Sequence, residues 1–219
     1  EIARGLAVKN PQTLLHTDAV QGFLKVPCSA KTLGADFLTI SAHKIGGPKG
    51  AGALYTAPAL RNLRPLLPGG GQEGGLRSGT EATAQIAGFA RAVVLRQENL
   101  AEKLRHMADI KAYCRERLLS IPGVVPVGQG EAPHILAVSL VGYPSANIVT
   151  DLGAKGICIS AGSACHRGKA SHVVSALHLD KKTAAGVIRV SFGPETTRAD
   201  IDGLYQALLD HKNQRFPML

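Results

Sequence analysis

A lysine stands where an apolar, strand-like segment meets a turn rich in glycine. Lys44 follows the segment 37–40 (FLTI) and precedes the turn 46–50 (GGPKG). At such a junction a lysine is partly desolvated, which disfavours its ammonium form and frees the amine for Schiff-base chemistry. Ser41 and His43 beside it offer a hydroxyl and an imidazole, donors that suit a bound phosphate. Together these features point to pyridoxal phosphate (PLP), although a solvated loop lysine would give the same pattern.

An acid closes a second strand-like segment. Asp18 ends the short strand predicted over 14–18, at the sheet edge where α/β proteins bind ligands. A PLP ring draws electrons only while its pyridine nitrogen keeps a proton, and a buried carboxylate can hold that proton. Asp18 could serve in this way, and Gln21 could contact the phenolic oxygen of the ring. A turn or helix cap made by Asp18 is the alternative that these residues leave open.

Small and basic residues surround one of the four cysteines. Cys165 follows the small residues 162–164 (GSA) and precedes His166, Arg167 and Lys169. Cations lower the pKa of a nearby thiol, so that more thiolate is present at neutral pH. The thiolate is the species that attacks sulfur. The pattern therefore predicts a nucleophilic cysteine on a loop, with an inert small residue as the alternative.

The other cysteines give no such signal. Cys158 lies between two isoleucines in an apolar run, which predicts a buried, structural thiol in a short strand. We interpret Cys28 and Cys114 as structural too. Because the cysteines form no CxxC pairs, a zinc site is not predicted and no residue is assigned to a metal. Scattered cysteines, in a chain whose start resembles no signal peptide, indicate reduced thiols and a cytoplasmic location.

Apolar periodicity divides the chain into alternating strands and helices. Strands are predicted over 14–18, 36–40, 50–55, 124–127, 135–140, 157–159 and 187–192. Helical patterns cover 1–6, 83–119, 145–152, 171–177 and 197–209. Ser145 is expected to cap its helix at the N-terminus. This alternation predicts an α/β class, and we expect a boundary between two units near residue 97.

The composition is that of an ordinary globular protein. The 219 residues are 45% hydrophobic, and no apolar run reaches the length needed to span a membrane. The net charge of +9 is spread thinly, without blocks of like charge. Basic residues do not interleave with aromatic ones, so neither nucleic acid nor a membrane is predicted as a partner. A positive field does favour a phosphorylated cofactor and an anionic substrate.

Five segments, in order along the chain, resemble the cysteine desulfurases, which are PLP enzymes of the class V aminotransferase group. They are 16–21 (HTDAVQ), 41–50 (SAHKIGGPKG), 69–80 (GGGQEGGLRSGT), 159–165 (ISAGSAC) and 188–193 (IRVSFG). The resemblance implies an α/β fold that is the C-terminal part of a PLP-dependent fold-type I transferase, with a partial large-domain sheet and a small α/β domain. Residues 1–97 would belong to the large, PLP-binding domain, and residues 98–219 would form the small domain that carries the cysteine loop.

The resemblance also implies a cofactor site, residue by residue. Lys44 would form the Schiff base with PLP and later move the Cα proton of the substrate. Asp18 would pair with the pyridinium nitrogen, and Gln21 with the phenolic oxygen. Ser41 and His43 would hold the phosphate.

Further residues would complete the reaction and the assembly. Thr80 would reach the phosphate of a neighbouring subunit, which implies a homodimer with shared sites. Arg189 would bind the substrate carboxylate, a task that suits its planar guanidinium. Cys165 would attack the sulfur of L-cysteine and leave as a persulfide, with alanine released. A sulfur-acceptor protein would take that sulfur, for example in iron–sulfur cluster assembly.

The chain departs from the family in length. It is little more than half as long as a usual member, so we expect that it lacks the family's N-terminal portion and begins partway through a longer protein. Gly74 also stands where the family usually has arginine. Besides a cysteine desulfurase, the residues leave open a selenocysteine lyase, another class V aminotransferase-like enzyme, or a truncated, non-catalytic interaction module.

Overall fold

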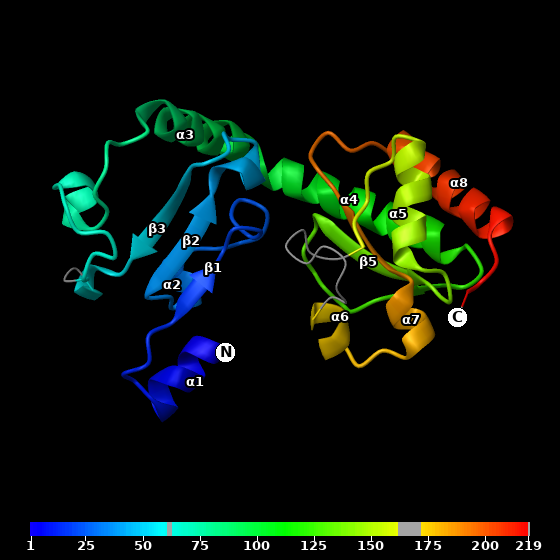
Figure 1. The fold of residues 1–219 in the computed structure, drawn as a ribbon, viewed down its shortest axis with the longest axis horizontal. Helices are drawn as coiled ribbons and strands as arrows, with labels where there is room; N and C mark the ends of the chain where they lie inside the picture. Colours follow the sequence, from blue (N-terminus) through cyan, green and yellow to red (C-terminus); the bar gives the residue numbers. More distant parts are fainter. Residues whose placement is uncertain (61–62, 162–171, 219) are drawn as a thin grey trace. The chain divides into compact units, whose positions relative to one another are not determined.

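The computed structural model describes residues 1–60, 63–161 and 172–218. The chain divides into two compact units, Glu1–Leu100 and Ala101–Leu219 (Figure 1). Each unit combines helices with a β-sheet, so the predicted α/β class is confirmed. The roles that the sequence assigns to residues 1–97 and 98–219 stay predictions. In the described part of the chain, no helix is long and apolar enough to cross a membrane.

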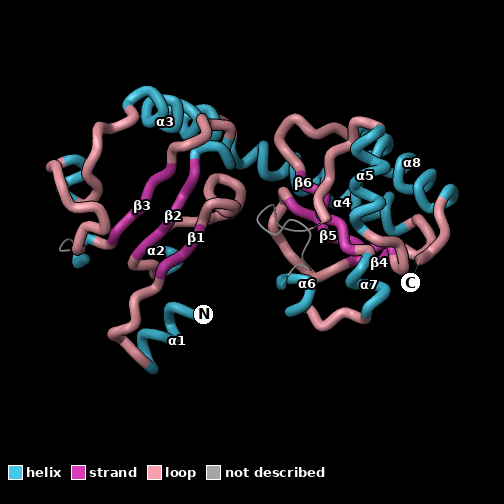
Figure 2. The backbone as a smooth tube through the Cα atoms, in the orientation of Figure 1, coloured by secondary structure: helices cyan, strands magenta, loops and turns pink. Residues whose placement is uncertain are grey.

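In the first unit a sheet joins its strands in the order β1–β2–β3 (Figure 2). These strands are β1 (His16–Asp18), β2 (Phe37–Ser41) and β3 (Gly52–Thr56), and they confirm the strands predicted here. β1 runs parallel to β2, with Asp18 opposite Thr39, whereas β3 runs antiparallel to β2. Because β1 and β2 are parallel, Asp18 and Ser41 mark the same carboxyl edge of the sheet.

Short helical segments connect and flank these strands. They are α1 (Ile2–Lys9), α2 (Ala30–Leu33) and the 3-10 turns η1 (Ala42–Ile45), η2 (Pro58–Leu60) and η3 (Gln72–Gly75). Turn η1 follows β2 directly, and Gly46 caps its C-terminus with a φ of 89°, a left-handed conformation that glycine adopts without strain. A side chain on Gly47 would press against Ala42 and Ala92, so η1 and the following long helix approach closely.

The helical pattern predicted over 83–119 is divided between two helices. α3 (Thr83–Gln97) and α4 (Leu100–Leu119) are separated by Glu98 and Asn99. Glu98 leaves the helical region with a ψ of 120°, and Asn99 has a left-handed φ of 51°. Asparagine tolerates this conformation because its short polar side chain can bond locally. Apolar periodicity runs through the break and does not reveal it.

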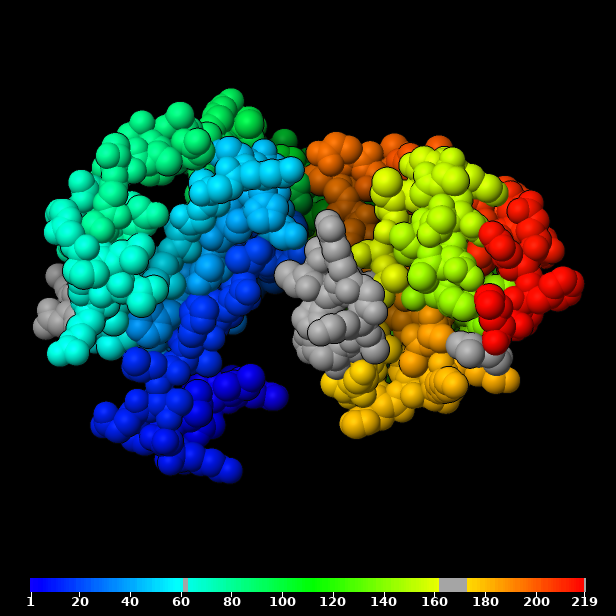
Figure 3. Space-filling model, in the orientation of Figure 1, coloured from blue at the N-terminus to red at the C-terminus, as the bar shows by residue number. Residues whose placement is uncertain are grey.

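In the second unit an antiparallel sheet joins its strands in the order β4–β5–β6. The strands are β4 (Val124–Pro126), β5 (Ile135–Leu140) and β6 (Val187–Ser191), and the helices besides α4 are α5 (Ser145–Ala154), α6 (His172–Ala176), α7 (Lys181–Ala185) and α8 (Arg198–Gln214). The helices α4, α5 and α8 share one hydrophobic core with the sheet, in which Met107, Leu140, Ile148 and Leu208 are fully buried. Helices α5 and α8 pack side by side (Figure 3).

The N-terminus of α5 differs from the prediction. Pro144, and not Ser145, is the N-cap residue, and Ser145 is the first residue of the helix. The fixed φ of proline suits an extended cap residue, here with a φ of −61° and a ψ of 122°. The predicted cap was therefore wrong by one residue.

The segment 157–159 forms no strand, contrary to the prediction. It approaches β6 only through an isolated bridge, one residue later, between Ser160 and Arg189. Cys158 is exposed, while the isoleucines on either side of it are half-buried and pack against the core. Successive side chains of an extended segment face opposite ways, so an apolar run does not bury every member. The prediction of a buried, structural Cys158 was wrong.

Candidate active site

Lys44 lies in turn η1, directly after strand β2. Ser41 ends that strand, and its Oγ lies 2.8 Å from Nδ1 of His43, within hydrogen-bond distance. Lys44 itself is half-buried, whereas Ala42 and Ile45 of the same turn pack into a core with α3. That core fixes the backbone on which Lys44 is mounted, while the side chain stays accessible.

A second lysine, Lys25, belongs to the same neighbourhood. Its pKa is lowered to about 8, first by burial and then by the positive charges of Arg96 and Lys44. These charges make this part of the first unit electropositive. The Nζ of Lys25 lies 3.5 Å from Oε1 of Gln21. The sequence analysis missed Lys25, although a charged residue within the apolar stretch 23–26, four positions after Gln21, is a signal that could have found it.

Asp18 ends β1 at the carboxyl edge of the sheet, and Gln21 follows in the next turn. Oδ1 of Asp18 accepts a 2.9 Å hydrogen bond from the backbone N–H of Val20, which is the turn considered as the alternative role of this acid. Asp18 and Gln21 are both exposed. A carboxylate has a second oxygen that can accept from a ligand, so the turn does not exclude the predicted role.

Thr80 follows a loop that is stabilised by hydrogen bonds between its own residues. Oγ of Ser78 donates to the carbonyl of Leu67 at 3.0 Å, and the N–H of Gly79 donates to Oε1 of Gln72 at 3.3 Å. Thr80 is exposed at the end of this loop. Its predicted contact with a neighbouring subunit stays a prediction, and the loop offers an exposed hydroxyl for it.

Arg189 belongs to the second unit, in the middle of strand β6. Its backbone N–H and carbonyl pair with Ser160, at 2.7 and 3.1 Å. Its Nε is buried and finds no hydrogen-bond partner among the described residues. A buried donor of a cation without a partner is costly, so this position favours an anionic ligand.

Cys165 lies outside the described residues. The described chain before it ends at position 161, directly after the residue that pairs with Arg189. The first unit therefore brings Asp18, Gln21, Ser41, His43 and Lys44 to one edge of its sheet, while Arg189 stands in the second unit next to the start of the segment that contains Cys165.

Residues 3–204, nearly the whole chain, match the aminotransferase class-V family. The chain belongs to this family. This class V chain is 35% identical over 221 residues to the cysteine desulfurase IscS of Clostridium botulinum, across 98% of the chain and 55% of that relative. It is 37% identical over 212 residues to the mitochondrial cysteine desulfurase of Candida albicans, across 93% of the chain and 43% of that relative. The chain thus spans about half the length of the curated relatives it matches.

The class V chain also shares its fold with solved structures. A NifS-like protein superposes with a TM-score of 0.86 at 32% identity, over 98% of this chain and 56% of that one. A NifS-like protein from Rickettsia africae superposes with a TM-score of 0.85 at 31% identity, over 97% of this chain and 57% of that one. The fold class and the resemblance to cysteine desulfurases that the sequence predicts are therefore confirmed.

Proposed function

We propose that the protein is a PLP-dependent cysteine desulfurase, which converts L-cysteine to L-alanine and keeps the sulfur as a persulfide on Cys165. The observation that carries this proposal is the arrangement at one sheet edge, where Lys44 follows β2 and Asp18 ends the parallel strand β1. An amine and a carboxylate at the carboxyl edge of parallel strands suit a ligand bound there. The names of relatives at 35% and 37% identity support the same activity.

The residues at this edge fit PLP. Lys44 offers a half-buried amine for the cofactor aldehyde, and the adjacent hydroxyl and imidazole of Ser41 and His43 suit its phosphate. The cations Lys25 and Arg96 make the surroundings electropositive, as a dianionic phosphate requires. Bound PLP supplies an electron-withdrawing ring that stabilises negative charge at the Cα atom of the substrate.

Four side chains of this chain would transfer a proton or bind a part of the cofactor or substrate. Nζ of Lys44 would take the Cα proton of the substrate and return a proton later in the turnover. The carboxylate of Asp18 would hold the proton on the ring nitrogen, and Gln21 would bind the phenolic oxygen. The guanidinium of Arg189, whose Nε has no partner among the described residues, would bind the substrate carboxylate.

The sulfur step uses a thiolate on Cys165. Its Sγ would form a bond to the sulfur of L-cysteine while the carbon–sulfur bond of the substrate breaks. The electron pair of that bond stays on the carbon, which takes a proton and becomes the methyl group of alanine. The enzyme keeps a persulfide, whose outer sulfur then passes to an acceptor protein.

The activity is tested with the purified protein, PLP and L-cysteine. We expect alanine to form, with sulfide released when a thiol reductant is present. Lys44→Ala should abolish both PLP attachment and activity, whereas Cys165→Ala should keep the colour of bound PLP and lose persulfide formation. Cys158→Ala is the matched control, because this exposed cysteine has no assigned role. Absence of alanine and sulfide would overturn the proposal, and a folded protein without PLP colour would favour a non-catalytic interaction module.

Shared sites in a homodimer would be revealed by mixing variants. Lys44→Ala and Thr80→Ala each damage every site of their own homodimer. In a mixed dimer, one site would combine Lys44 from the Thr80→Ala subunit with Thr80 from the Lys44→Ala subunit. We therefore expect activity to reappear on mixing after dissociation and reassociation, and the absence of any recovery would contradict a role of Thr80 in the partner's site.

Substrate choice and location complete the proposal. Comparison of L-cysteine with L-selenocysteine as substrates separates a desulfurase from a selenocysteine lyase, according to which of the two substrates the protein turns over faster. Free thiols at Cys28, Cys114 and Cys158 suit a reducing compartment, and we infer the cytoplasm. A fluorescent fusion retained in another compartment would contradict that location.

A further inference from the structure

The backbone of Lys25 is fixed through the residue before it, which has a strained conformation and packs against a core. Leu24, directly before it, has a φ of 54°, in the left-handed region that bulky side chains avoid. The side chain of Leu24 packs against the core formed by η1 and α3, which includes Ala42 and Phe89. A strained backbone persists only where the surrounding structure fixes it. The core therefore holds the backbone of Lys25 in a defined direction beside the turn that carries Lys44.

The amine of Lys25 faces the side chain of Gln21. Nζ of Lys25 lies 3.5 Å from Oε1 of Gln21, at the long end of a hydrogen bond. The other charges that act on this amine belong to Arg96 on α3 and Lys44 on η1, and burial together with these cations lowers the pKa of Lys25 to about 8. The ammonium group of Lys25 can only donate hydrogen bonds, so it favours the orientation of Gln21 in which the amide oxygen faces Lys25.

We infer that Lys25 is a positioning residue, which fixes the amide of Gln21 so that its NH₂ group is free to donate to the phenolic oxygen of PLP. This inference rests on the proposed function, because it concerns the same cofactor. The two orientations of a glutamine amide differ only in which of oxygen and nitrogen faces a given partner. A donor such as Lys25 selects the orientation in which the amide oxygen of Gln21 faces it. The NH₂ group of Gln21 then faces the phenolic oxygen of PLP, which accepts a hydrogen bond. Without Lys25 the amide oxygen can face the cofactor oxygen and repel it.

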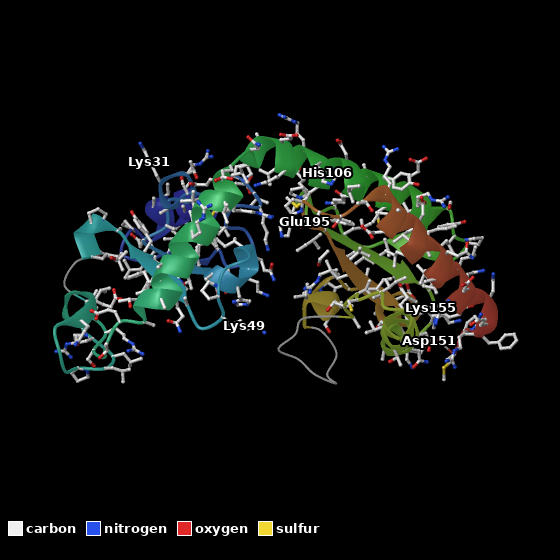
Figure 4. The ribbon with its side chains drawn as sticks, turned by 90° about the horizontal axis from the view of Figure 1, so that it is seen from above. Lys31, Lys49, His106, Asp151, Lys155 and Glu195 are labelled. Atoms are coloured by element: carbon white, nitrogen blue, oxygen red, sulfur yellow. The ribbon has the colours of Figure 1, made fainter. Side chains whose placement is uncertain are left out.

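The test measures PLP binding by the purified protein, from the absorbance of the bound cofactor during titration. Lys25→Met removes the donor and keeps the length of the side chain, and we expect affinity to fall about five- to tenfold, the effect of one hydrogen bond. Lys25→Arg keeps a donor and should retain affinity within about twofold. Lys31→Met is the matched control, because Lys31 is exposed on α2 (Figure 4) and should bind PLP like the unmodified protein.

A double-mutant cycle shows whether Lys25 acts through Gln21. Gln21→Leu alone should weaken PLP binding as much as Lys25→Met does, and addition of Lys25→Met to Gln21→Leu should cause no further loss. Full additivity of the two losses, or equal binding by Lys25→Met and Lys31→Met, would overturn the inference while leaving the proposed function intact. If the unmodified protein binds no PLP, both fail together. Unchanged thermal unfolding of Lys25→Met would show that the loss is not a folding defect.

Discussion

Helices α5 and α8 are joined by one carboxylate that serves two basic side chains. Oδ2 of Asp151 accepts from Nδ1 of His211 at 2.9 Å and from Nε of Arg215 at 3.1 Å, and Oδ1 accepts from Nη2 of Arg215 at 3.1 Å. His211 is only 3% exposed. Figure 4 labels Asp151, which lies on α5, and Lys155, the residue that caps the C-terminus of this helix. We predict that Asp151→Ala lowers the free energy of unfolding of the second unit by about 2–3 kcal/mol.

The magnitude follows from the burial of each partner. Loss of the carboxylate leaves the buried ring nitrogen of His211 without its partner, which costs about 1–3 kcal/mol. The Arg215 side chain is 55% exposed, so its share of the ion pair adds only about 0–1 kcal/mol. Hydrogen bonds from Arg215, and next from His211, lower the pKa of Asp151 below its usual 3.8. A carboxyl group with a lowered pKa stabilises the fold above its ordinary pKa, and that contribution disappears as the pH falls through the lowered native pKa.

Urea unfolding at pH 7, followed by circular dichroism, measures the difference. The matched control is Lys155→Met, which breaks the 3.0 Å bridge between Lys155, the C-cap residue of α5, and Asp210 of α8. Both side chains of that bridge are more than a third exposed, so the control should lose no more than about 0.5–1 kcal/mol. Equal losses in the two variants would refute the argument that the buried imidazole sets the magnitude.

Three further predictions concern stability and thiol reactivity in the second unit. Gly186→Ala would place a Cβ atom against the carbonyl of Leu140 in β5, and we expect a loss of about 2–3 kcal/mol in urea unfolding. Thr197→Ala removes the capping box at the start of α8, and it should cost about 1 kcal/mol in the same assay, with Thr197→Ser restoring most of it. Burial raises the pKa of the Cys114 thiol to about 12, so a thiol reagent at pH 8, followed by mass spectrometry, should label exposed Cys158 but not Cys114 until urea unfolds the protein.

The sequence predicted strands best where apolar runs end at strong breakers. The segment 135–140 coincides with β5, because proline and glycine bound it and its alternate residues enter the core. The segment 157–159 has the same apolar character but forms no ladder, since only its neighbour Ser160 meets the edge strand β6. Strand formation there depends on a partner strand, and a single sequence does not show the partner.

The candidate site was predictable only in part. Lys44 was found because its environment is local, a strand end followed by glycines. Lys25 was missed because its lowered pKa of about 8 arises from burial and from Arg96, which is distant in the sequence and reaches it only through the fold. For Asp18 the sequence left open a cofactor ligand or a turn, and within this chain the side chain is exposed and caps its own turn. Local chemistry is thus visible in the sequence, whereas charges brought together by packing are not.

The backbone pairing of Ser160 with Arg189 connects two proposed functional residues of the second unit. Arg189 is proposed to bind the substrate carboxylate, and Ser160 precedes the segment that contains the proposed nucleophile Cys165. Two backbone hydrogen bonds, of 2.7 and 3.1 Å, fix Ser160 to the strand that carries the guanidinium. The segment that contains Cys165 leaves the described chain one residue after Ser160. The proposed nucleophile Cys165 would have to reach a bound substrate, and catalysis depends on accurate positioning of the reacting atoms. A fixed backbone position at the start of the segment would favour such positioning. Strand β6 is paired along its length with β5 and carries Arg189. The same strand therefore fixes both the backbone of Arg189 and, through Ser160, the start of the segment that contains Cys165.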